Sequence, residues 1–459
     1  MTTKITTCTA RHSLPDGQVH LLGAVKSVTG AMTRVETGNA ALLVDCGVAQ
    51  GREASRWEFP EAARDVDAVL LTHGHNDHVG SLPHLIDGGF DKPILGTAAT
   101  LDVAELVLRD GLRINGVSDR DAAAFRRRFK RLKRVVKYDL ATGVPGFEGG
   151  IVFREAGHIL GSASVDIQSQ YARVICSGDL GRPDSPILRD YCESWGPRPA
   201  DVVVMESTYG DREHRCSHDD VEKELERIVM RATARKGHIL IPAFAIGRTQ
   251  TLLYHLNTLI EAGRIPNIPV AVDTPFGLRV TETYAKSRRL FDAEALGKIS
   301  RGDDPLDFDS LYAVWKGRDS VRLRDVPGPM VIIAGSGMCT GGRIMGHLQE
   351  LLPNESTTLL FVGFQAPGTG GRKIQEAARN RHGGGSTKVW LDGEQVTVRA
   401  NIETLSGLSA HADRSELRRW LGAIPRPRRV ALHHGEVDAQ NGFRDWMETT
   451  SACGAGAHP

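Results

Sequence analysis

The stretch LTHGHNDHVG (residues 71–80) places four ligand-type side chains within six residues, directly after an apolar run. They are His73, His75, Asp77 and His78. Zinc accepts imidazole and carboxylate ligands alongside thiolate. His73 and His75 can turn their rings to one ion from an extended turn, and Asp77 and His78 can reach a second ion nearby. A polar loop without a metal is the alternative, and the H-x-H-x-D-H spacing favours metal ligation over it.

Several other short apolar runs in the first 200 residues also end near a polar residue. LLVDCG contains Asp45, EAGHILGSAS contains His158, and CSGDLG contains Asp179. Such bounded runs predict buried strands, and loops at strand ends are held by a rigid scaffold. Taken alone, Asp179 is better explained as a turn residue, and His158 fits a core or capping role equally well. Their joint occurrence, in order, carries the argument.

This order of motifs resembles the metallo-β-lactamase superfamily, whose signature is H-x-H-x-D-H after a strand. The resemblance implies an α/β fold with an αββα sandwich and two Zn²⁺ ions per protomer. Asp45 then resembles the carboxylate that orients histidine ligands. The implied ligands are His73, His75 and His158 for one ion, Asp77, His78 and His434 for the other, and Asp179 as the bridge.

The last ligand comes from LHHGE, in which two histidines are adjacent. His433 and His434 point apart if RVALHH is a strand. We expect His434, which begins HGE, to be the ligand rather than His433.

Two further motifs resemble the β-CASP subgroup, whose members process nucleic acids. MESTYGDREH contains Glu206, and LSAHADRSEL contains His411. The similarity is closest to compact prokaryotic RNA-processing members, related to the nuclease of the eukaryotic pre-mRNA cleavage machinery. Two metal ions can generate a hydroxide at neutral pH, and a histidine with a carboxylate partner can protonate the leaving oxygen. We therefore expect Asp77, Glu206 and His411 to be catalytic. An N-cap or turn acid and a hydrogen-bonded core histidine are the alternatives for the last two.

The chain has 459 residues, which predicts two domains or one fold with an insertion. From about Asp211 the pattern changes to alternating helices and strands, as in a parallel α/β unit. A helix is predicted from Ser217 to Gly237, with acidic residues in its first turn and basic residues in its last. The GGGS at 383–386 is the candidate linker. The expected domains are residues 1–211 and 385–459 for the metallo-β-lactamase part and residues 212–384 for the β-CASP insertion.

Three glycine-rich stretches in the insertion each lead to an arginine: AGSGMCTGGRIMGHL, PAFAIGRTQTLL and GFQAPGTGGRKIQE. Backbone amides at such turns can bind phosphate, although tight packing explains many of them. The expected phosphate or RNA contacts are Arg248, Ser336, Gly337, Arg343 and Arg372. The basic run FRRRFKRLKRVVK (125–137) reads as a solvated helix face or, second, as a phosphate-binding helix.

The charge and the cysteine pattern of the chain indicate in which cellular compartment it works. The formal net charge is +1, so a nucleic-acid surface has to be local. None of the seven cysteines forms a Cys-x-x-Cys pair, and we find neither a signal core nor a membrane-spanning run. We expect a cytoplasmic protein with no membrane partner.

The leading hypothesis is a zinc-dependent phosphodiesterase acting on single-stranded RNA. A DNA nuclease of the same subgroup is the nearest rival. By the family resemblance, the last motif of DNA-repair members has a valine at the position of His434, which favours RNA for this chain. A small-molecule thioester or lactam hydrolase would not explain Glu206, His411 or the insertion. A catalytically inactive scaffold subunit is expected to lose ligands that this chain keeps. Endonuclease or exonuclease action and the oligomeric state, a homodimer included, remain open.

Overall fold

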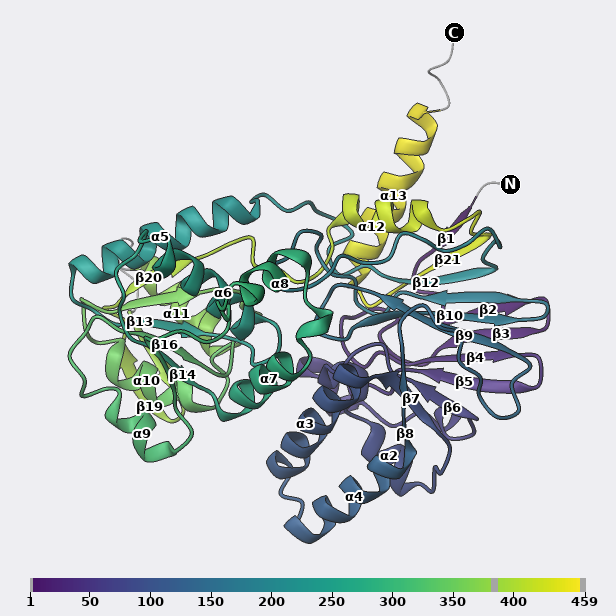
Figure 1. Ribbon diagram of the computed structural model, residues 1–459, viewed down its shortest axis with the longest axis horizontal. Helices are drawn as coiled ribbons and strands as arrows, with labels where there is room; N and C mark the ends of the chain where they lie inside the picture. The colour runs from purple at the N-terminus through teal and green to yellow at the C-terminus, as the bar shows by residue number, and fades with distance from the viewer. Residues whose placement is uncertain (1–2, 381–386, 455–459) are drawn as a thin grey trace. The chain divides into compact units, whose positions relative to one another are not determined.

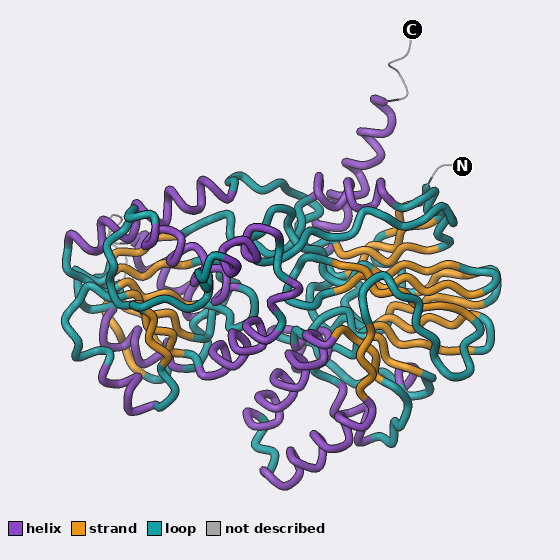
Figure 2. The backbone as a smooth tube through the Cα atoms, in the orientation of Figure 1, coloured by secondary structure: helices purple, strands orange, loops and turns teal. Residues whose placement is uncertain are grey.

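The computed structural model describes residues 3–380 and 387–454 and divides into two compact units. Unit 1 comprises residues 1–213 and 410–459, and unit 2 comprises residues 214–409. The sheets of each unit stand out as separate sets of strands in Figure 2. No described helix combines the length and apolar character that crossing a membrane requires.

Unit 1 contains two mixed sheets. The first has the order β2-β3-β4-β5-β6-β7-β8, and the second has the order β1-β21-β12-β11-β10-β9. The strands of the first sheet are β2 (Arg11–Leu14), β3 (Gly17–Leu21), β4 (Thr33–Thr37), β5 (Ala40–Val44), β6 (Ala68–Leu70), β7 (Ile94–Thr97) and β8 (Lys133–Val136). Those of the second are β1 (Lys4–Thr6), β9 (Gly149–Glu155), β10 (Ala163–Ser169), β11 (Arg173–Cys176), β12 (Val202–Glu206) and β21 (Arg429–His433).

The core of unit 1 lies between these two sheets. Val35 and Leu42 of the first sheet join one apolar cluster with Phe153, Val165 and Val174 of the second. β4 alternates buried and half-buried residues, as a strand with one covered face does. Burial of such apolar surface is the main driving force for this layered arrangement.

Helices cover the outer faces of both sheets (Figure 1). Leu417 and Trp420 of α12 and Phe443 of α13 pack on Ile175 and Val203 of the second sheet. On the other side α3 packs on β7 and β8. These helices are α1 (Asn76–Val79), α2 (Leu82–Asp87), α3 (Ala98–Ile114), α4 (Asp119–Leu132), α12 (Arg414–Ala423) and α13 (Val437–Gly454). The order helix, sheet, sheet, helix confirms the predicted αββα sandwich.

Unit 2 is built on a parallel sheet with the order β15-β14-β16-β13-β17-β20. Its strands are β13 (Ile239–Pro242), β14 (Val270–Asp273), β15 (Leu311–Ala313), β16 (Val331–Ala334), β17 (Thr358–Phe361) and β20 (Asn401–Thr404). A hairpin of β18 (Lys388–Leu391) and β19 (Glu394–Thr397) packs beside the sheet. Its helices are α5 (His218–Ala234), α6 (Arg248–Glu261), α7 (Pro275–Lys286), α8 (Ala293–Ser300), α9 (Gly317–Arg322), α10 (Arg343–Leu351) and α11 (Gly370–Asn380). Ser217 caps α5 through a capping box with Asp220, at the predicted helix start.

The second domain boundary differs from the prediction. The chain returns to unit 1 between residues 409 and 410, not between 384 and 385. The reason is non-local pairing: β20 completes the unit 2 sheet beside β17, and Val389 and Val396 of the hairpin join its core. The predicted GGGS linker lies outside the described residues.

A buried ion pair stabilises the second sheet of unit 1. Asp166 of β10 and Arg173 of β11 are both fully buried, and two hydrogen bonds of 2.9 and 2.8 Å join them. The guanidinium also donates to the carbonyls of Trp195 and Arg198. Removing one member of such a pair leaves a charge buried without its counter-ion.

We predict that Asp166→Asn lowers the free energy of unfolding by about 3–5 kcal/mol, measured by denaturant titration. Asp139→Asn is the matched control, because Asp139 is an exposed partner of Arg154 in the same unit. The control should cost less than about 1 kcal/mol. Equal, small effects of both substitutions would contradict a structural role for the buried pair.

Candidate metal centre

The candidate ligands of unit 1 lie at strand ends that the two sheets bring together. His73 and His75 follow β6, and Asp179 follows β11. Glu206 ends β12 and is in register with His433 of the parallel neighbour β21, so His434 comes next to it. Loops at strand ends can present polar side chains while the sheet below holds them in place.

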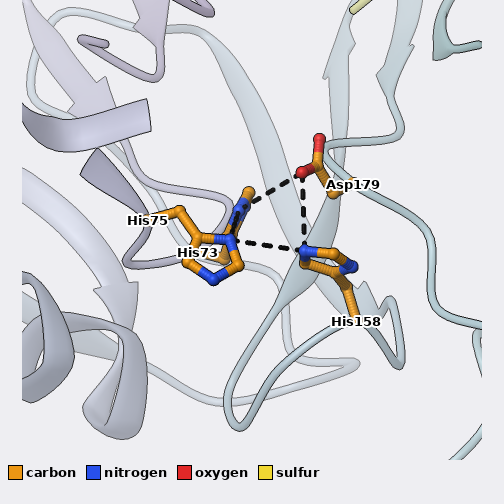
Figure 3. Close-up of side chains that lie close together, drawn as sticks. All are labelled: His73, His75, His158 and Asp179. Atoms are coloured by element: carbon orange, nitrogen blue, oxygen red, sulfur yellow. Dashed lines mark hydrogen bonds and ion pairs between the residues drawn. The ribbon is translucent and has the colours of Figure 1, made fainter. Parts of the chain in front are cut away.

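One ligand group surrounds a carboxylate oxygen of Asp179 (Figure 3). Nε2 of His73 and Nε2 of His158 each lie 3.5 Å from Oδ2 of Asp179. Nδ1 of His75 lies 3.0 Å from the His73 nitrogen and 3.3 Å from the His158 nitrogen. Four potential ligand atoms therefore face one small volume.

A second ligand group surrounds the other oxygen of the same carboxylate. Nε2 of His78 and Nδ1 of His434 each lie 3.3 Å from Oδ1 of Asp179. Nε2 of His434 lies 3.4 Å from Oδ2 of Asp77. Asp179 thus directs one oxygen to each group, which is the arrangement expected of a bridging ligand.

The donor atoms fit divalent metal ions. Around a tetrahedral ion with bonds of about 2.1 Å, ligand atoms lie about 3.4 Å apart, close to the spacings in both groups. Nε2 of His78 and Oδ1 of Asp179 are buried atoms without a hydrogen-bond partner. Buried polar atoms are rarely left unpaired, so each points to a missing partner between the two groups. Imidazole nitrogens with carboxylate oxygens are a donor set that zinc accepts.

Burial and mutual charge control the pKa values in this centre. Burial lowers the pKa of His75 to about 4 and holds that of His73 well below its usual range. The neutral form that ligates a metal is thereby favoured. Burial opposes ionisation of Asp77, but the hydrogen bond from His434 and the charge of His78 bring its pKa down to about 2. The carboxylate, not the acid, faces the ligand group.

Asp45 connects the two ligand groups through contacts with the ring nitrogens that face away from Asp179. Its Oδ2 lies 2.7 Å from Nδ1 of His78 and accepts a 2.7 Å hydrogen bond from Oγ1 of Thr72. That hydroxyl oxygen lies 3.1 Å from Nδ1 of His73. Asp45 therefore fixes the ring orientation of His78 directly and that of His73 through Thr72.

The backbone at the centre adopts conformations that few side chains favour. Asp45 has a φ of 61° and His434 a φ of 46°, both in the left-handed region. Gly178, with a φ of 59°, precedes Asp179, and a Cβ there would lie 2.7 Å from Cβ of Thr72. Such conformations persist where the surrounding structure enforces them, commonly at functional sites.

Glu206 and His411 form a pair beside the first ligand group. Nδ1 of His411 lies 3.2 Å from Oε1 of Glu206, and the His411 ring centroid is 4.5 Å from that of His158. The buried carboxylate also accepts hydrogen bonds from the amides of Leu180 and Thr208. Burial would lower the pKa of His411, but the charge of Glu206 raises it to about 9. Bound cations would act in the opposite direction.

Three residues near these side chains were not foreseen from the sequence. Thr72 connects Asp45 to His73, and Thr208 lies with Oγ1 3.3 Å from Nδ1 of His434. The ring of Tyr209 meets that of His411 edge-on at 6.1 Å. Each directly adjoins a motif residue or lies within three positions of one, which is the only sequence signal they offer. His433 lies apart from the ligand groups, since its Nε2 faces the carbonyl of Gly23 at 2.8 Å.

The five predicted phosphate contacts all belong to unit 2. The guanidinium of Arg343 hydrogen-bonds Asp273 and the carbonyls of Val314 and Trp315, so its contacts indicate a structural role. Asp273 is fully buried and also receives hydrogen bonds from Ser320 and His347. The pair of Arg343 and Asp273 is 70 residues apart, so the sequence around either residue does not predict it.

Of the other four candidates, Ser336 and Gly337 lie in the loop after β16, Arg248 begins α6, and Arg372 lies in the first turn of α11. Ser336 accepts a hydrogen bond from the amide of Thr340, and Gly337 is buried. Arg248 donates to the carbonyl of Val362, and Arg372 lies over the ring of Phe364. Phosphate binding by these four residues and by Arg343 stays a prediction.

The basic run at 125–137 forms the end of α4 and strand β8. Arg126, Lys130 and Lys133 form ion pairs with Glu105 of α3, and Arg128 pairs with Asp87. These contacts favour the first interpretation, a solvated helix face. Ion pairs along this face join α4 and β8 to Glu105 of α3.

We predict that Asp45→Asn weakens metal binding by about 10- to 100-fold, because the amide cannot hold the His78 ring as a carboxylate does. The measurement is chelator-competition titration of the full chain. Asp67→Asn is the control, since Asp67 accepts a backbone hydrogen bond from Ala41 at the start of the neighbouring strand. Unchanged affinity in Asp45→Asn would exclude this positioning role.

Comparisons with known proteins identify metallo-hydrolase domains in this chain. Family models match for the metallo-β-lactamase superfamily (residues 28–236), the β-CASP domain (249–374) and the Zn-dependent metallo-hydrolase RNA specificity domain (395–452). The chain is 37% identical to Ribonuclease TTHA0252 of Thermus thermophilus, over 91% of this chain and 92% of that protein. It is 32% identical to Transcription termination factor FttA of Methanothermobacter thermautotrophicus, over 90% of this chain but 66% of that protein.

A solved structure, a protein of unknown function from Enterococcus faecalis, shares the fold. Its TM-score is 0.54 at 13% identity, and the match covers 92% of this chain and 94% of that one. Together with the family matches, these similarities establish the family. The chain belongs to the β-CASP family of metallo-β-lactamase hydrolases, a family that includes ribonucleases.

Proposed function

We propose that this protein is a two-zinc ribonuclease that hydrolyses phosphodiester bonds of single-stranded RNA. The observation that carries the proposal is Asp179, whose two carboxylate oxygens face separate ligand groups at 3.3–3.5 Å. His73, His75 and His158 would hold one ion, and Asp77, His78 and His434 the other. Bound there, two divalent ions would lower the pKa of a water molecule and neutralise charge on phosphate oxygens.

RNA is the preferred substrate class on two grounds. The segment 395–452 matches a model described as an RNA specificity domain, and a relative that aligns along nearly its whole length is named a ribonuclease. A small-molecule hydrolase would use the same ligand groups but would have no evident need for Glu206 and His411 beside them.

The chain's own contribution to bond cleavage is the proton for the leaving oxygen. Glu206 ends a buried strand, and two amide hydrogen bonds fix its carboxylate. With Nδ1 of His411 directed at Oε1 of Glu206, Nε2 is the nitrogen through which His411 can donate a proton. A positioned general acid of this kind contributes about 100- to 10,000-fold to a rate.

The proposal is tested by incubating the purified, zinc-loaded chain with end-labelled RNA and DNA of the same sequence. We expect a ladder or terminal products from RNA, abolished by a chelator and restored by added zinc. The ladder also distinguishes internal from terminal cleavage. Cleavage of DNA alone, or hydrolysis of a thioester with RNA left intact, would contradict the proposed substrate.

A second experiment separates metal binding from proton transfer. We predict that His411→Ala keeps both ions and lowers RNA cleavage by about 100- to 10,000-fold. A nitrophenyl phosphodiester should be far less affected, because its leaving group needs no proton. Glu206→Gln should show the same pattern more mildly. Loss of zinc in His411→Ala would make the residue a ligand, and equal losses on both substrates would exclude general-acid catalysis.

A further inference from the structure

The carboxyl-terminal edge of the unit 2 sheet gathers exposed aromatic rings. Phe244 follows β13 by two residues, Phe364 follows β17 by three, and Trp315 follows β15 by two. Their exposures are 44%, 61% and 41%, although large aromatic side chains are normally buried. In parallel α/β sheets this edge is where ligands bind.

Two of the rings stand on neighbouring strands. β13 and β17 pair directly, so the loops that carry Phe244 and Phe364 follow adjacent strands of the sheet. The ring of Phe244 lies over Gly337, where a Cβ would come within 2.9 Å of it. The absence of a side chain at Gly337 thus leaves room for the Phe244 ring.

Hydrogen bonds fix the loops around these rings. Gln365, next to Phe364, donates through Nε2 to the carbonyls of Gly337 and Gly363 at 2.9 and 3.1 Å. Arg248, at the start of α6, donates to the carbonyl of Val362 at 2.7 Å. The loop that carries Phe364 is therefore held in place before any ligand arrives, which lowers the entropic cost of binding.

Cationic side chains accompany the rings. The guanidinium carbon of Arg372 lies 5.9 Å from the Phe364 centroid, and that of Arg279 lies 5.9 Å from the Trp315 centroid. Arg343 donates to the carbonyl of Trp315 and so supports the loop of the third ring. Two of the three rings thus have a guanidinium beside them, and this combination matches a ligand that carries both flat apolar groups and negative charges.

We propose that Phe244, Phe364 and Trp315 form a stacking platform for unpaired nucleobases, with Arg372 and Arg279 beside the intervening phosphates. This inference rests on the proposed function, because it takes RNA as the ligand. Stacking on aromatic rings tolerates any base, since every base has a π-face. Bases in a duplex have no free face to offer, so the platform selects single-stranded RNA without reading its sequence.

The test measures equilibrium binding of the full, zinc-loaded chain to a short oligouridylate with phosphorothioate linkages, which resist hydrolysis, and intact oligomer is verified after each measurement. Phe364→Ala should weaken binding by about 5- to 150-fold, the usual effect of losing one stacked base. Phe364→Trp should restore it, and Phe364→Leu, which keeps an apolar side chain without a ring, should not. A melting temperature within a few degrees of wild type checks that each variant folds.

Two controls make the result specific. Trp390→Ala removes a ring that is 63% exposed on the β18 hairpin, outside the loops that follow β13, β15 and β17, and should leave affinity unchanged. An abasic oligomer with the same backbone should bind wild type and Phe364→Ala equally, because it has no base to stack. Equal binding by all variants, recovery in Phe364→Leu, or the same loss with the abasic oligomer would each overturn the platform.

Failure of the platform and failure of the proposed function are distinguishable. If wild type cleaves RNA but the ring variants bind unchanged, the platform is wrong and the ribonuclease proposal stands. If wild type binds the oligonucleotide through its rings but cleaves no RNA, the platform stands and the proposed chemistry is wrong.

Discussion

The rest of the centre depends on the placement of one carboxylate, that of Asp179. Its two oxygens face two groups of imidazoles, so a shift of its position would disturb both groups together. The chain fixes it from several sides: Gly178 adopts a left-handed turn before it, and β11 holds the segment between β10 and β12. A carboxylate buried among histidines needs counter-charge, and divalent ions between the two groups would supply it.

Both units carry their candidate functional side chains at or just after the ends of strands, although their sheets differ. In unit 1 the metal centre collects side chains from loops of two mixed sheets, held by a sandwich core. In unit 2 a single parallel sheet presents aromatic rings and arginines along its carboxyl edge. The first arrangement suits a largely buried centre with fixed polar groups for bond cleavage, and the second suits an exposed surface for holding a strand of nucleic acid.

Site residues were easiest to predict from the sequence where they lie close together along the chain. His73, His75, Asp77 and His78 share one turn, so their spacing alone indicated metal ligation. Asp179 needed the order of motifs and the family resemblance, because a single Asp after a strand is usually a turn residue. Thr72 escaped notice, since only the fold reveals the hydrogen bonds that make it a link between Asp45 and His73.

Non-local contacts account for the differences. Arg343 followed a glycine-rich turn typical of phosphate sites, yet its partner is the buried Asp273 on another strand. The two units divide at residue 409 rather than at the predicted 384 because β20 pairs with β17 in unit 2. The glycines of these loops serve packing as well: Gly337 accommodates the ring of Phe244, a relation between two distant loops that composition cannot show.

The central claim, two metal ions bridged by Asp179, is tested most directly by anomalous diffraction at the zinc edge from crystals of the zinc-loaded chain. The account predicts two anomalous peaks about 3.5–4 Å apart, with one Asp179 oxygen bound to each. A single peak, or two peaks with both Asp179 oxygens on the same ion, would contradict it.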